Sequence, residues 1–540
     1  MRYSLHRRCK FLIVPGRHHP CLARDPGAVS LSPGSTQLRS AASTNLYKEG
    51  EATVTTTQRA PFVEGFESLV DEVSGVPLEV HGDMPRWLNG ALLRNGPAHY
   101  GSGTKTVRHW FDGQAMIHRF SISADGVHYT NRFLDTPSKR AVVDRGTIEY
   151  PEFATDPCQS LFARFFTSFA SKPPNCNAAV NIVPMGGGVS GVTETPLPIE
   201  FNASTLETVG VVKYTDSLKG NVTTAHPQRR PGTNTIVNYL LKFSRNSSYL
   251  VYAQDASGLK RAEVAQVKVD KPSYMHSFGI TAEHAVLVEF PYVVDPLSFV
   301  FRRRPFIENY RWRPDRGTRI TLVGLDSGVV TSYRLDEPLF AFHHVNAFTD
   351  EEGVHIDLVA YETAEIVDGF YLARLKEGAA LPAANLVRLT VDTATGRVTR
   401  RTLSKHASEL PRIDSERAGL PYRYVYGDGV RNDGDFLSTV VKIDVQDGEA
   451  TCWEETGTYP GEPVFVPRPG RQNGPEGEDD GVILTVVLDT ARSTSFLCVL
   501  DARSMKEVAR AYAPHTIPFG FHGGFLPRET PLTSNEDLSL

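Results

Sequence analysis

Four histidines share an apolar, strand-like setting and are the residues best suited to chemistry. They occur in the segments Thr224-Ala225-His226-Pro227, Tyr274-Met275-His276-Ser277, Phe342-His343-His344-Val345 and Phe521-His522-Gly523-Gly524. A lone histidine in such a strand is more often a hydrogen-bonded core residue than a ligand. None of the four stands beside a cysteine or in a short zinc motif, so a metal site requires that the fold bring them together.

Four neutral imidazoles that converge can hold a divalent metal, and imidazole suits zinc, copper, iron or nickel without selecting among them. A closed tetrahedral zinc site would be structural. An octahedral iron with four imidazoles would keep two positions open and pass electrons to dioxygen, which zinc does not do. The histidines alone leave these alternatives open.

Three glutamates are suited to orienting such ligands. A ligating imidazole usually donates its second N–H to a carboxylate or carbonyl, which fixes the tautomer. Glu194, Glu409 and Glu462 stand in apolar, strand-like segments that fit this role. The acids between residues 475 and 480 have no apolar neighbours, and we interpret them as solvated charge.

Composition excludes several classes of protein. The chain has 540 residues, of which 40% are hydrophobic and 22% charged, as in ordinary soluble domains. A net charge of -5 argues against a general nucleic-acid binder. There is no uninterrupted apolar run of about 18 residues, so we expect no membrane-spanning helix. The cysteines form no C-x-x-C pair, which indicates a reduced compartment.

The chain divides into a basic N-terminal segment and one large domain. Residues 1–45 carry seven basic residues against a single acid, Asp25, which is the balance of an organellar transit peptide. A disordered basic tail is the alternative. The Arg-rich start favours a mitochondrion over a plastid, and without a transit peptide the protein would be cytoplasmic. Residues 60–540 are predicted to form a single domain.

That domain is predicted to be built of strands. The segments 118–123, 285–290 and 482–487 alternate or run apolar between turn residues, as β-strands do. Two segments, 156–170 and 504–511, are predicted to be helical.

A weak repeat indicates how the strands are arranged. An apolar-x-(Asp/Asn) step into a turn recurs at intervals of 52 to 68 residues, at Asn202, Asp270, Asp326, Asp392, Asp444 and Asp501. Such repeats predict propeller blades, about seven in the domain, with repeated two-sheet sandwiches as the alternative. Innermost strands of a propeller begin near a common axis, so this fold would gather the histidines, although His276 fits the repeat poorly.

The chain resembles the carotenoid cleavage oxygenases from about residue 60 to its C-terminus. The resemblance rests on the histidine segments and on Leu88-Asn89-Gly90, Arg94-Asn95-Gly96-Pro97, His109-Trp110-Phe111-Asp112-Gly113 and Tyr459-Pro460-Gly461-Glu462-Pro463. It implies an all-β fold, a seven-bladed β-propeller with a cap of helices and loops over the metal-bearing face.

The resemblance also implies the residues of the site. It implies a ferrous iron, Fe(2+), with four histidine ligands: His226, His276, His343 and His522. Three of these imidazoles would be oriented by carboxylates, those of Glu194, Glu409 and Glu462. The family's spacing to Asn346 selects His343 over His344 as the ligand. Thr193 matches a position that crowds an open coordination site, and is therefore the candidate catalytic residue for dioxygen access.

A membrane contact follows from the same resemblance. The segment from Asp156 to Phe166 is similar to a loop of the animal-type branch, which includes carotenoid cleavers and a retinoid isomerohydrolase. Its phenylalanines predict that the region Cys158 to Phe169 dips into a membrane surface, with a buried helix as the alternative. Phe299, near three arginines at 302–304, is a second candidate contact, unless these arginines are an ordinary solvated face.

The implied activity is Fe(II)-dependent cleavage by dioxygen of a conjugated C=C bond in a carotenoid or apocarotenoid, which gives two carbonyl products. The transit-like N-terminus and the animal-type loop favour eccentric 9',10' cleavage. Central 15,15' cleavage, stilbene cleavage and retinyl-ester isomerohydrolysis are alternatives on the same site. A non-catalytic propeller that serves as an interaction platform is the alternative from another class.

Overall fold

The computed structural model describes residues 60–102, 105–155, 176–301, 304–406, 408–431, 435–472 and 474–528. All of them belong to one compact unit, Gln58–Leu540. The predictions of a transit peptide in residues 1–45, of a membrane-dipping segment from Cys158 to Phe169 and of a helix at 156–170 lie outside the described residues.

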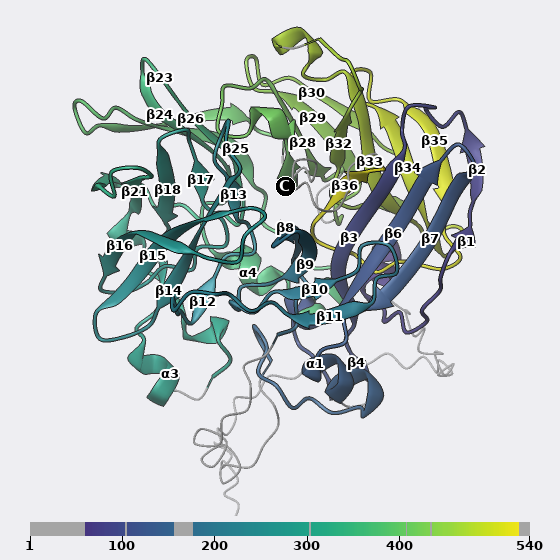
Figure 1. Ribbon diagram of the computed structural model, residues 1–540, viewed down its shortest axis with the longest axis horizontal. Helices are drawn as coiled ribbons and strands as arrows, with labels where there is room; N and C mark the ends of the chain where they lie inside the picture. The colour runs from purple at the N-terminus through teal and green to yellow at the C-terminus, as the bar shows by residue number, and fades with distance from the viewer. Residues whose placement is uncertain are drawn as a thin grey trace, which may run out of the picture. The chain divides into compact units, whose positions relative to one another are not determined.

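Seven antiparallel sheets of four to six strands surround a common axis as the blades of a propeller (Figure 1). The predicted all-β, seven-bladed fold is therefore confirmed. From the axis outward, blade 1 contains β36 (Gly523–Pro527), β3 (Gly90–His99), β6 (Gln114–Ser123), β7 (Gly126–Phe133) and β1 (Val76–Pro77). Blade 2 contains β8 (Asn181–Met185), β9 (Gly188–Val192), β10 (Ile199–Phe201) and β11 (Thr208–Val211).

The next three blades follow in chain order. Blade 3 contains β12 (Val222–Thr223) and β13 (Gln228–Arg229) at the axis, then β14 (Thr235–Lys242), β15 (Ser247–Asp255) and β16 (Ala262–Val269). Blade 4 contains β17 (Gly279–Ile280), β18 (His284–Glu289), β21 (Thr318–Gly324) and β22 (Val330–Leu335). Blade 5 contains β23 (His344–Asp350), β24 (Gly353–Ala360), β25 (Asn385–Val391) and β26 (Val398–Ser404).

Two blades complete the ring. Blade 6 contains β27 (Ser408–Arg412), β28 (Tyr424–Gly429), β29 (Thr439–Asp444) and β30 (Ala450–Trp453). Blade 7 contains β31 (Thr458–Pro460) and β32 (Val464–Pro467) at the axis, then β33 (Gly481–Asp489), β34 (Thr494–Asp501), β35 (Glu507–Tyr512) and β2 (Glu79–Gly82). Two separate two-stranded sheets pair β4 (Gly101–Ser102) with β5 (Lys105–Thr106) and β19 (Tyr292–Val293) with β20 (Arg311–Trp312).

The two ends of the described chain close the ring. The C-terminal strand β36 pairs with β3 in blade 1, and the N-terminal strand β2 pairs with β35 in blade 7. In Figure 1, purple and blue strands from the N-terminal part of the chain consequently lie beside yellow strands from its C-terminal part. Each end of the chain thus completes a sheet that the other end builds.

Burial along the strands follows from this stacking. The central strand β33 is buried along nearly its whole length, because neighbouring blades cover both of its faces, whereas the outermost strand β22 is largely exposed. The strands predicted at 118–123, 285–290 and 482–487 are confirmed as parts of β6, β18 and β33.

Two predictions about local structure are wrong. Residues 504–511 do not form a helix, since β35 pairs with β34 and β2 and buries Ala509 and Ala511 in alternation. The helix-forming alanines there were outweighed by sheet pairing. Asp270 is not a member of the repeat, because it follows the outermost strand of blade 3. The equivalent residue is Asp255, which ends β15 at the turn into β16, and this explains why His276 fitted the repeat poorly.

A cap of short helices and loops covers one end of the ring. It includes η1 (Pro61–Phe66), η2 (Trp110–Asp112), α4 (Glu365–Gly369) and α5 (Leu372–Lys376). The other short helices are α1 (Pro137–Lys139), η3 (Arg140–Asp144), α3 (Leu297–Phe301), η4 (Ile307–Asn309), η5 (Pro314–Arg316), η6 (Ser415–Arg417) and η7 (Pro475–Gly477). None of the helices within the described ranges is long and apolar enough to cross a bilayer.

Candidate metal centre and cavity

The four predicted ligands lie at the axis, where the innermost strands of four blades begin. His226 occupies the turn between β12 and β13, and His276 precedes β17 by three residues. His343 directly precedes β23, and His522 directly precedes β36. The fold therefore brings together four histidines that are far apart in the sequence.

Their ring nitrogens face one another. Nε2 of His226 lies 3.0 Å from Nε2 of His276, and Nε2 of His343 lies 3.3 Å from Nε2 of His522. One nitrogen from each ring can be chosen so that all four lie within 4.8 Å of one another. A set of converging imidazole nitrogens with no carboxylate among them suits a first-row transition metal.

A carboxylate holds the far side of three of these rings. Nδ1 of His276 lies 2.8 Å from Glu194 Oε1, Nδ1 of His343 lies 2.6 Å from Glu409 Oε2, and Nδ1 of His522 lies 2.7 Å from Glu462 Oε1. Since an ionised carboxylate only accepts, each Nδ1 carries the proton and each Nε2 keeps a free lone pair. Three lone pairs that face one another form a donor set suited to a cation.

The histidines and glutamates of the centre come from all seven blades. The histidines come from blades 1, 3, 4 and 5, and the glutamates come from blades 2, 6 and 7. Each blade thus contributes one residue to the centre. His344, by contrast, is not part of the group, and its Nδ1 lies 2.9 Å from Ser277 Oγ.

Two of the carboxylates are held by neutral hydroxyl groups. Tyr274 donates to Glu194 across 2.8 Å, and Tyr361 donates to Glu409 across 2.6 Å. Burial raises the pKa of Glu409, but the partner His343 and the hydrogen bonds to the carboxylate outweigh burial and leave the pKa below its usual range. Glu409 therefore stays ionised at neutral pH.

The third carboxylate is held by charge. Glu462 is fully buried and pairs with Arg94, while Nη1 of Arg412 lies 3.7 Å away. Its Oε2 also accepts the Gly523 N–H across 3.0 Å. Burial raises the pKa of Glu462, but Arg412 and Arg94 outweigh this effect and hold the pKa well below its usual range.

A glycine makes that last contact possible. A Cβ atom at Gly523 would lie 2.0 Å from Leu93 O, so a larger residue would push β36 away from β3. Because Gly523 has no Cβ atom, β36 can lie close to β3, and the Gly523 N–H then reaches Glu462.

Three of the imidazoles, those of His226, His276 and His522, are neutral before any metal binds. Burial lowers the pKa of His276, and it lowers the pKa of His522 to about 4. Burial and the neighbouring imidazoles hold the pKa of His226 well below its usual value. Neutral nitrogens are the form that binds a metal, so the donor set fits a divalent ion.

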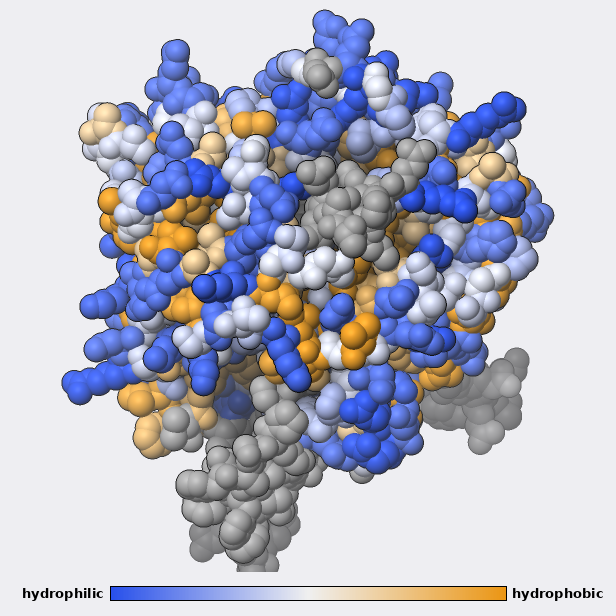
Figure 2. Space-filling view, in the orientation of Figure 1, coloured by the Kyte–Doolittle hydropathy of each residue, from blue (hydrophilic) through white to orange (hydrophobic). Residues whose placement is uncertain are grey.

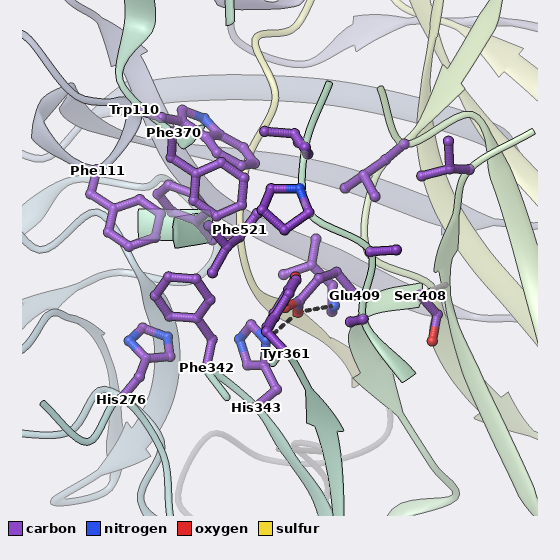
Figure 3. Close-up of a pocket in the computed structure, with 18 of the residues that line it drawn as sticks. Trp110, Phe111, His276, Phe342, His343, Tyr361, Phe370, Ser408, Glu409 and Phe521 are labelled. Carbon is purple, nitrogen blue, oxygen red and sulfur yellow. Dashed lines mark hydrogen bonds and ion pairs between the residues drawn. The ribbon is translucent and has the colours of Figure 1, made fainter. Parts of the chain in front are cut away.

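A cavity of about 300 Å³ opens beside the histidines and is lined mostly by apolar side chains. Figure 3 shows that aromatic rings group on one side of it, above His276 and His343; they belong to Trp110, Phe111, Phe342, Phe370 and Phe521. His276, His343 and His522 line the cavity, whereas His226 does not.

The walls come from the cap and from the axis. Phe370 directly follows α4 and stacks against Phe342 at 5.8 Å between ring centroids. Trp110 of η2 packs edge-on against Phe370 at 5.3 Å and donates its indole N–H to Phe519 O. The motif that contains Trp110 and Phe111 therefore builds the wall of the cavity.

Thr193 does not line the cavity beside the histidines. It lines a small separate cavity together with Thr224 and Pro227, which flank His226. Val180, which the sequence did not single out, lines the large cavity with the histidines. A role for Thr193 in dioxygen access stays a prediction.

Sequence reasoning also missed the groups that hold the glutamates. Tyr274 and Arg94 lie inside segments that were noted for other reasons. Tyr361 and Arg412 carry no local signal, because their contacts with Glu409 and Glu462 form only between neighbouring parts of the folded ring.

The chain matches the family model described as RPE65, retinal pigment epithelial membrane protein, over residues 66–527. The chain belongs to the RPE65/carotenoid oxygenase family. A mitochondrial carotenoid-cleaving dioxygenase of Macaca fascicularis is 32% identical over 537 residues, with 86% of this chain and 95% of that protein covered. A carotenoid isomerooxygenase of Galleria mellonella is also 32% identical, with 84% and 95% covered.

A further relative and a solved structure support the same family. The β,β-carotene 15,15'-dioxygenase of Mus musculus is 30% identical, with 86% of this chain and 93% of that protein covered. Among solved structures, cobalt-substituted apocarotenoid oxygenase of Synechocystis has a TM-score of 0.78 at 26% identity, with 87% of this chain and all of that chain covered. The chain is therefore an enzyme of the carotenoid oxygenase family and not a non-catalytic platform.

Proposed function

We propose that this carotenoid oxygenase is an Fe(II)-dependent dioxygenase that cleaves a conjugated C=C bond of a carotenoid or apocarotenoid into two carbonyl products. The observation that carries the proposal is the group of four imidazoles beside an aromatic cavity. The relatives named as carotenoid-cleaving enzymes support the substrate class. When bound, ferrous iron supplies the electrons that activate dioxygen, which zinc does not do.

The chain's own residues prepare this reaction without a nucleophile or a transferred proton. Glu194, Glu409 and Glu462 hold protons on the Nδ1 atoms and keep the Nε2 lone pairs free. The aromatic wall binds the polyene through apolar burial, at about 25 cal/mol per Å². The shape of the wall therefore decides which double bond lies beside His276, His343 and His522.

We expect Phe370→Leu to raise KM for a carotenoid by roughly threefold to tenfold, because it removes an aromatic contact worth about 0.5 to 1.5 kcal/mol. We also expect the proportions of cleavage products to change, because Phe370 shapes the wall. Steady-state kinetics and chromatography of products measure both. Phe348→Leu is the control, since Phe348 is equally buried but lies outside the cavity; an equal effect of both variants would contradict the assignment.

The position of cleavage is part of the proposal, and we favour 9',10' cleavage. Its support is the transit-like N-terminus and the likeness of the sequence at 156–166 to a loop of the animal-type branch. Incubation of the iron-loaded protein with β-carotene, an apocarotenal, a retinyl ester and resveratrol, followed by mass analysis, tests it. An apocarotenal and a shorter ionone from β-carotene support eccentric cleavage, and two equal halves indicate 15,15' cleavage.

The other substrates distinguish the remaining alternatives. Free cis-retinol from an all-trans retinyl ester would indicate isomerohydrolysis, and two phenolic aldehydes from resveratrol would indicate stilbene cleavage. Iron-loaded protein that yields no carbonyl product from either carotenoid contradicts the proposed function.

We also propose peripheral contact with a membrane, from which a sparingly soluble polyene would be drawn. The exposed side chains of α3 support it, since Leu297 and Phe301 are 62% and 76% exposed. Hydrophobic side chains gather at the lower left of Figure 2, where Figure 1 places α3. Phe299 itself is half-buried and stacks on Phe306 at 5.6 Å, so its neighbours present the apolar surface.

We expect the double variant Leu297→Ser/Phe301→Ser to bind phospholipid vesicles at least about tenfold more weakly, because burial of each side chain is worth about 1.5 to 3 kcal/mol. Co-sedimentation with vesicles of mixed neutral and anionic phospholipid measures the change. Val209→Ser is the matched control, since Val209 is 66% exposed on β11. Equal binding of the double variant and the wild type would exclude α3 as the contact.

For location, we propose a mitochondrion, as the composition of residues 1–45 and the names of several relatives suggest. A fluorescent protein fused behind residues 1–45 should enter mitochondria, and a diffuse cytoplasmic signal would contradict the proposal.

A further inference from the structure

One of the four histidines is positioned differently from the others. Carboxylates hold the rings of His276, His343 and His522, but no carboxylate within the described ranges binds His226. In the part of the chain that the structure describes, the aromatic rings packed against His226 are those of the other three histidines. Something other than its ring must fix its position.

Side-chain amides hold the main chain that carries His226. Asn181 donates from Nδ2 to Ala225 O across 2.9 Å, and Asn238 donates from Nδ2 to Thr224 O across 3.0 Å. The Thr224 hydroxyl accepts the His226 N–H across 3.0 Å and donates to His276 O. Three polar side chains thus fix the two residues before the ligand and the ligand's own N–H.

The two asparagines are themselves fixed. Both are buried, one on β8 of blade 2 and one on β14 of blade 3. Oδ1 of Asn181 accepts the Ile182 N–H across 2.8 Å, and Oδ1 of Asn238 accepts the Tyr239 N–H across 2.7 Å. Because each oxygen is occupied, each Nδ2 is directed at the turn.

We propose that Asn181 and Asn238 are positioning residues that hold His226 in the metal centre through its main chain. They do for the fourth ligand what Glu194, Glu409 and Glu462 do for the other three. Pro227 adds to this constraint by restricting the His226 backbone to extended conformations. The inference rests on the proposed metal site.

The difference has a chemical reason. Three carboxylates already surround the centre, and a fourth would add negative charge next to a divalent ion. Neutral amides fix the position of His226 without that charge. Since a carboxylate partner raises the basicity of an imidazole, His226 is the weakest donor of the four. Thr224 also ties the His226 turn to the main chain of His276, so the two ligands are positioned together.

The test is the affinity of the full-length protein for Co²⁺, measured by competition with a chelator. Asn181→Asp and Asn238→Asp keep the shape and the accepting oxygen but lose the donor. We expect each to bind Co²⁺ about tenfold more weakly, as for other residues that orient a ligand. We also expect a changed visible absorption spectrum of the bound cobalt, because one ligand is displaced.

Asn131→Asp is the matched control. Asn131 is buried, donates to Asp71 O and accepts the Val73 N–H, but it lies away from the histidines on β7. We expect its affinity for Co²⁺ to stay within twofold of the wild type. If an aspartate variant fails to fold, Asn181→Ala and Asn238→Ala remove the donor without adding charge and repeat the comparison.

A double-variant comparison separates positioning from general destabilisation. In a His226→Ala background, the substitutions at Asn181 and Asn238 should change the affinity for Co²⁺ less than twofold. An equal loss in both backgrounds, or no loss with His226 present, overturns the proposal. Failure of the wild type to bind one Co²⁺ per chain overturns the metal site itself, whereas unchanged variants of a binding wild type overturn only the role of the asparagines.

Discussion

His343→Asn should lower carotenoid cleavage by about a thousandfold and leave the protein with far less than one iron per chain. Nε2 of His343 faces Nε2 of His522 at 3.3 Å, and an asparagine side chain is too short to replace it there. A catalytic metal contributes several kcal/mol to transition-state stabilisation, and each 1.36 kcal/mol is a factor of ten in rate. Iron analysis after anaerobic reconstitution and single-turnover kinetics measure the two effects.

The neighbouring histidine provides the control. His344→Asn removes the adjacent imidazole, whose Nδ1 lies near Ser277 Oγ and which is not part of the metal group. We expect this variant to keep about one iron per chain and cleavage within tenfold of the wild type. If His344→Asn lost the iron and His343→Asn kept it, the assignment of the ligand would be wrong.

Glu462→Gln should destabilise the protein more than the same substitution at either of the other two glutamates. Glutamine still accepts a hydrogen bond from His522, but it removes the negative charge that pairs with the nearly buried Arg94. Removing one partner of a buried ion pair costs about 3 to 5 kcal/mol. Chemical denaturation of the metal-free protein measures this loss.

Glu409→Gln is the comparison, because Glu409 is held by the neutral Tyr361 instead of a guanidinium. We expect a loss of about 1 to 3 kcal/mol, the usual cost of a compromised buried hydrogen bond. Both variants should bind iron about 10 to 100 times more weakly. Equal losses of stability in the two variants would show that the ion pairs of Glu462 with Arg94 and Arg412 contribute no extra stability.

The sequence was informative where a residue's own surroundings determine its role. Each histidine and each glutamate of the centre stands in an apolar strand context, and a polar group in such a place must have a partner. The alternation of residues 118–123 likewise predicted β6. The repeat failed at Asp270 because Asp255 and Asp270 both stand where a strand ends, and only strand pairing shows which turn is equivalent.

Features that depend on several blades could not be predicted. Tyr361 contacts Glu409 across 48 positions of sequence, and Arg94 contacts Glu462 across 368. Phe370 lines the cavity because α4 folds back over the axis, which no local pattern indicates. The strand β35 shows the reverse case, in which good helix formers are overruled by pairing with β34 and β2.

Cleavage under isotopically labelled dioxygen tests the central claim most directly. Anaerobically iron-loaded protein would be mixed with β-carotene or an apocarotenal under ¹⁸O₂, and the products reduced at once to alcohols so that the label does not exchange with water. Splitting one C=C bond with one dioxygen molecule predicts two products, each carrying one ¹⁸O atom. Absence of the paired products, or label in only one of them, would contradict a dioxygenase at the four-histidine centre.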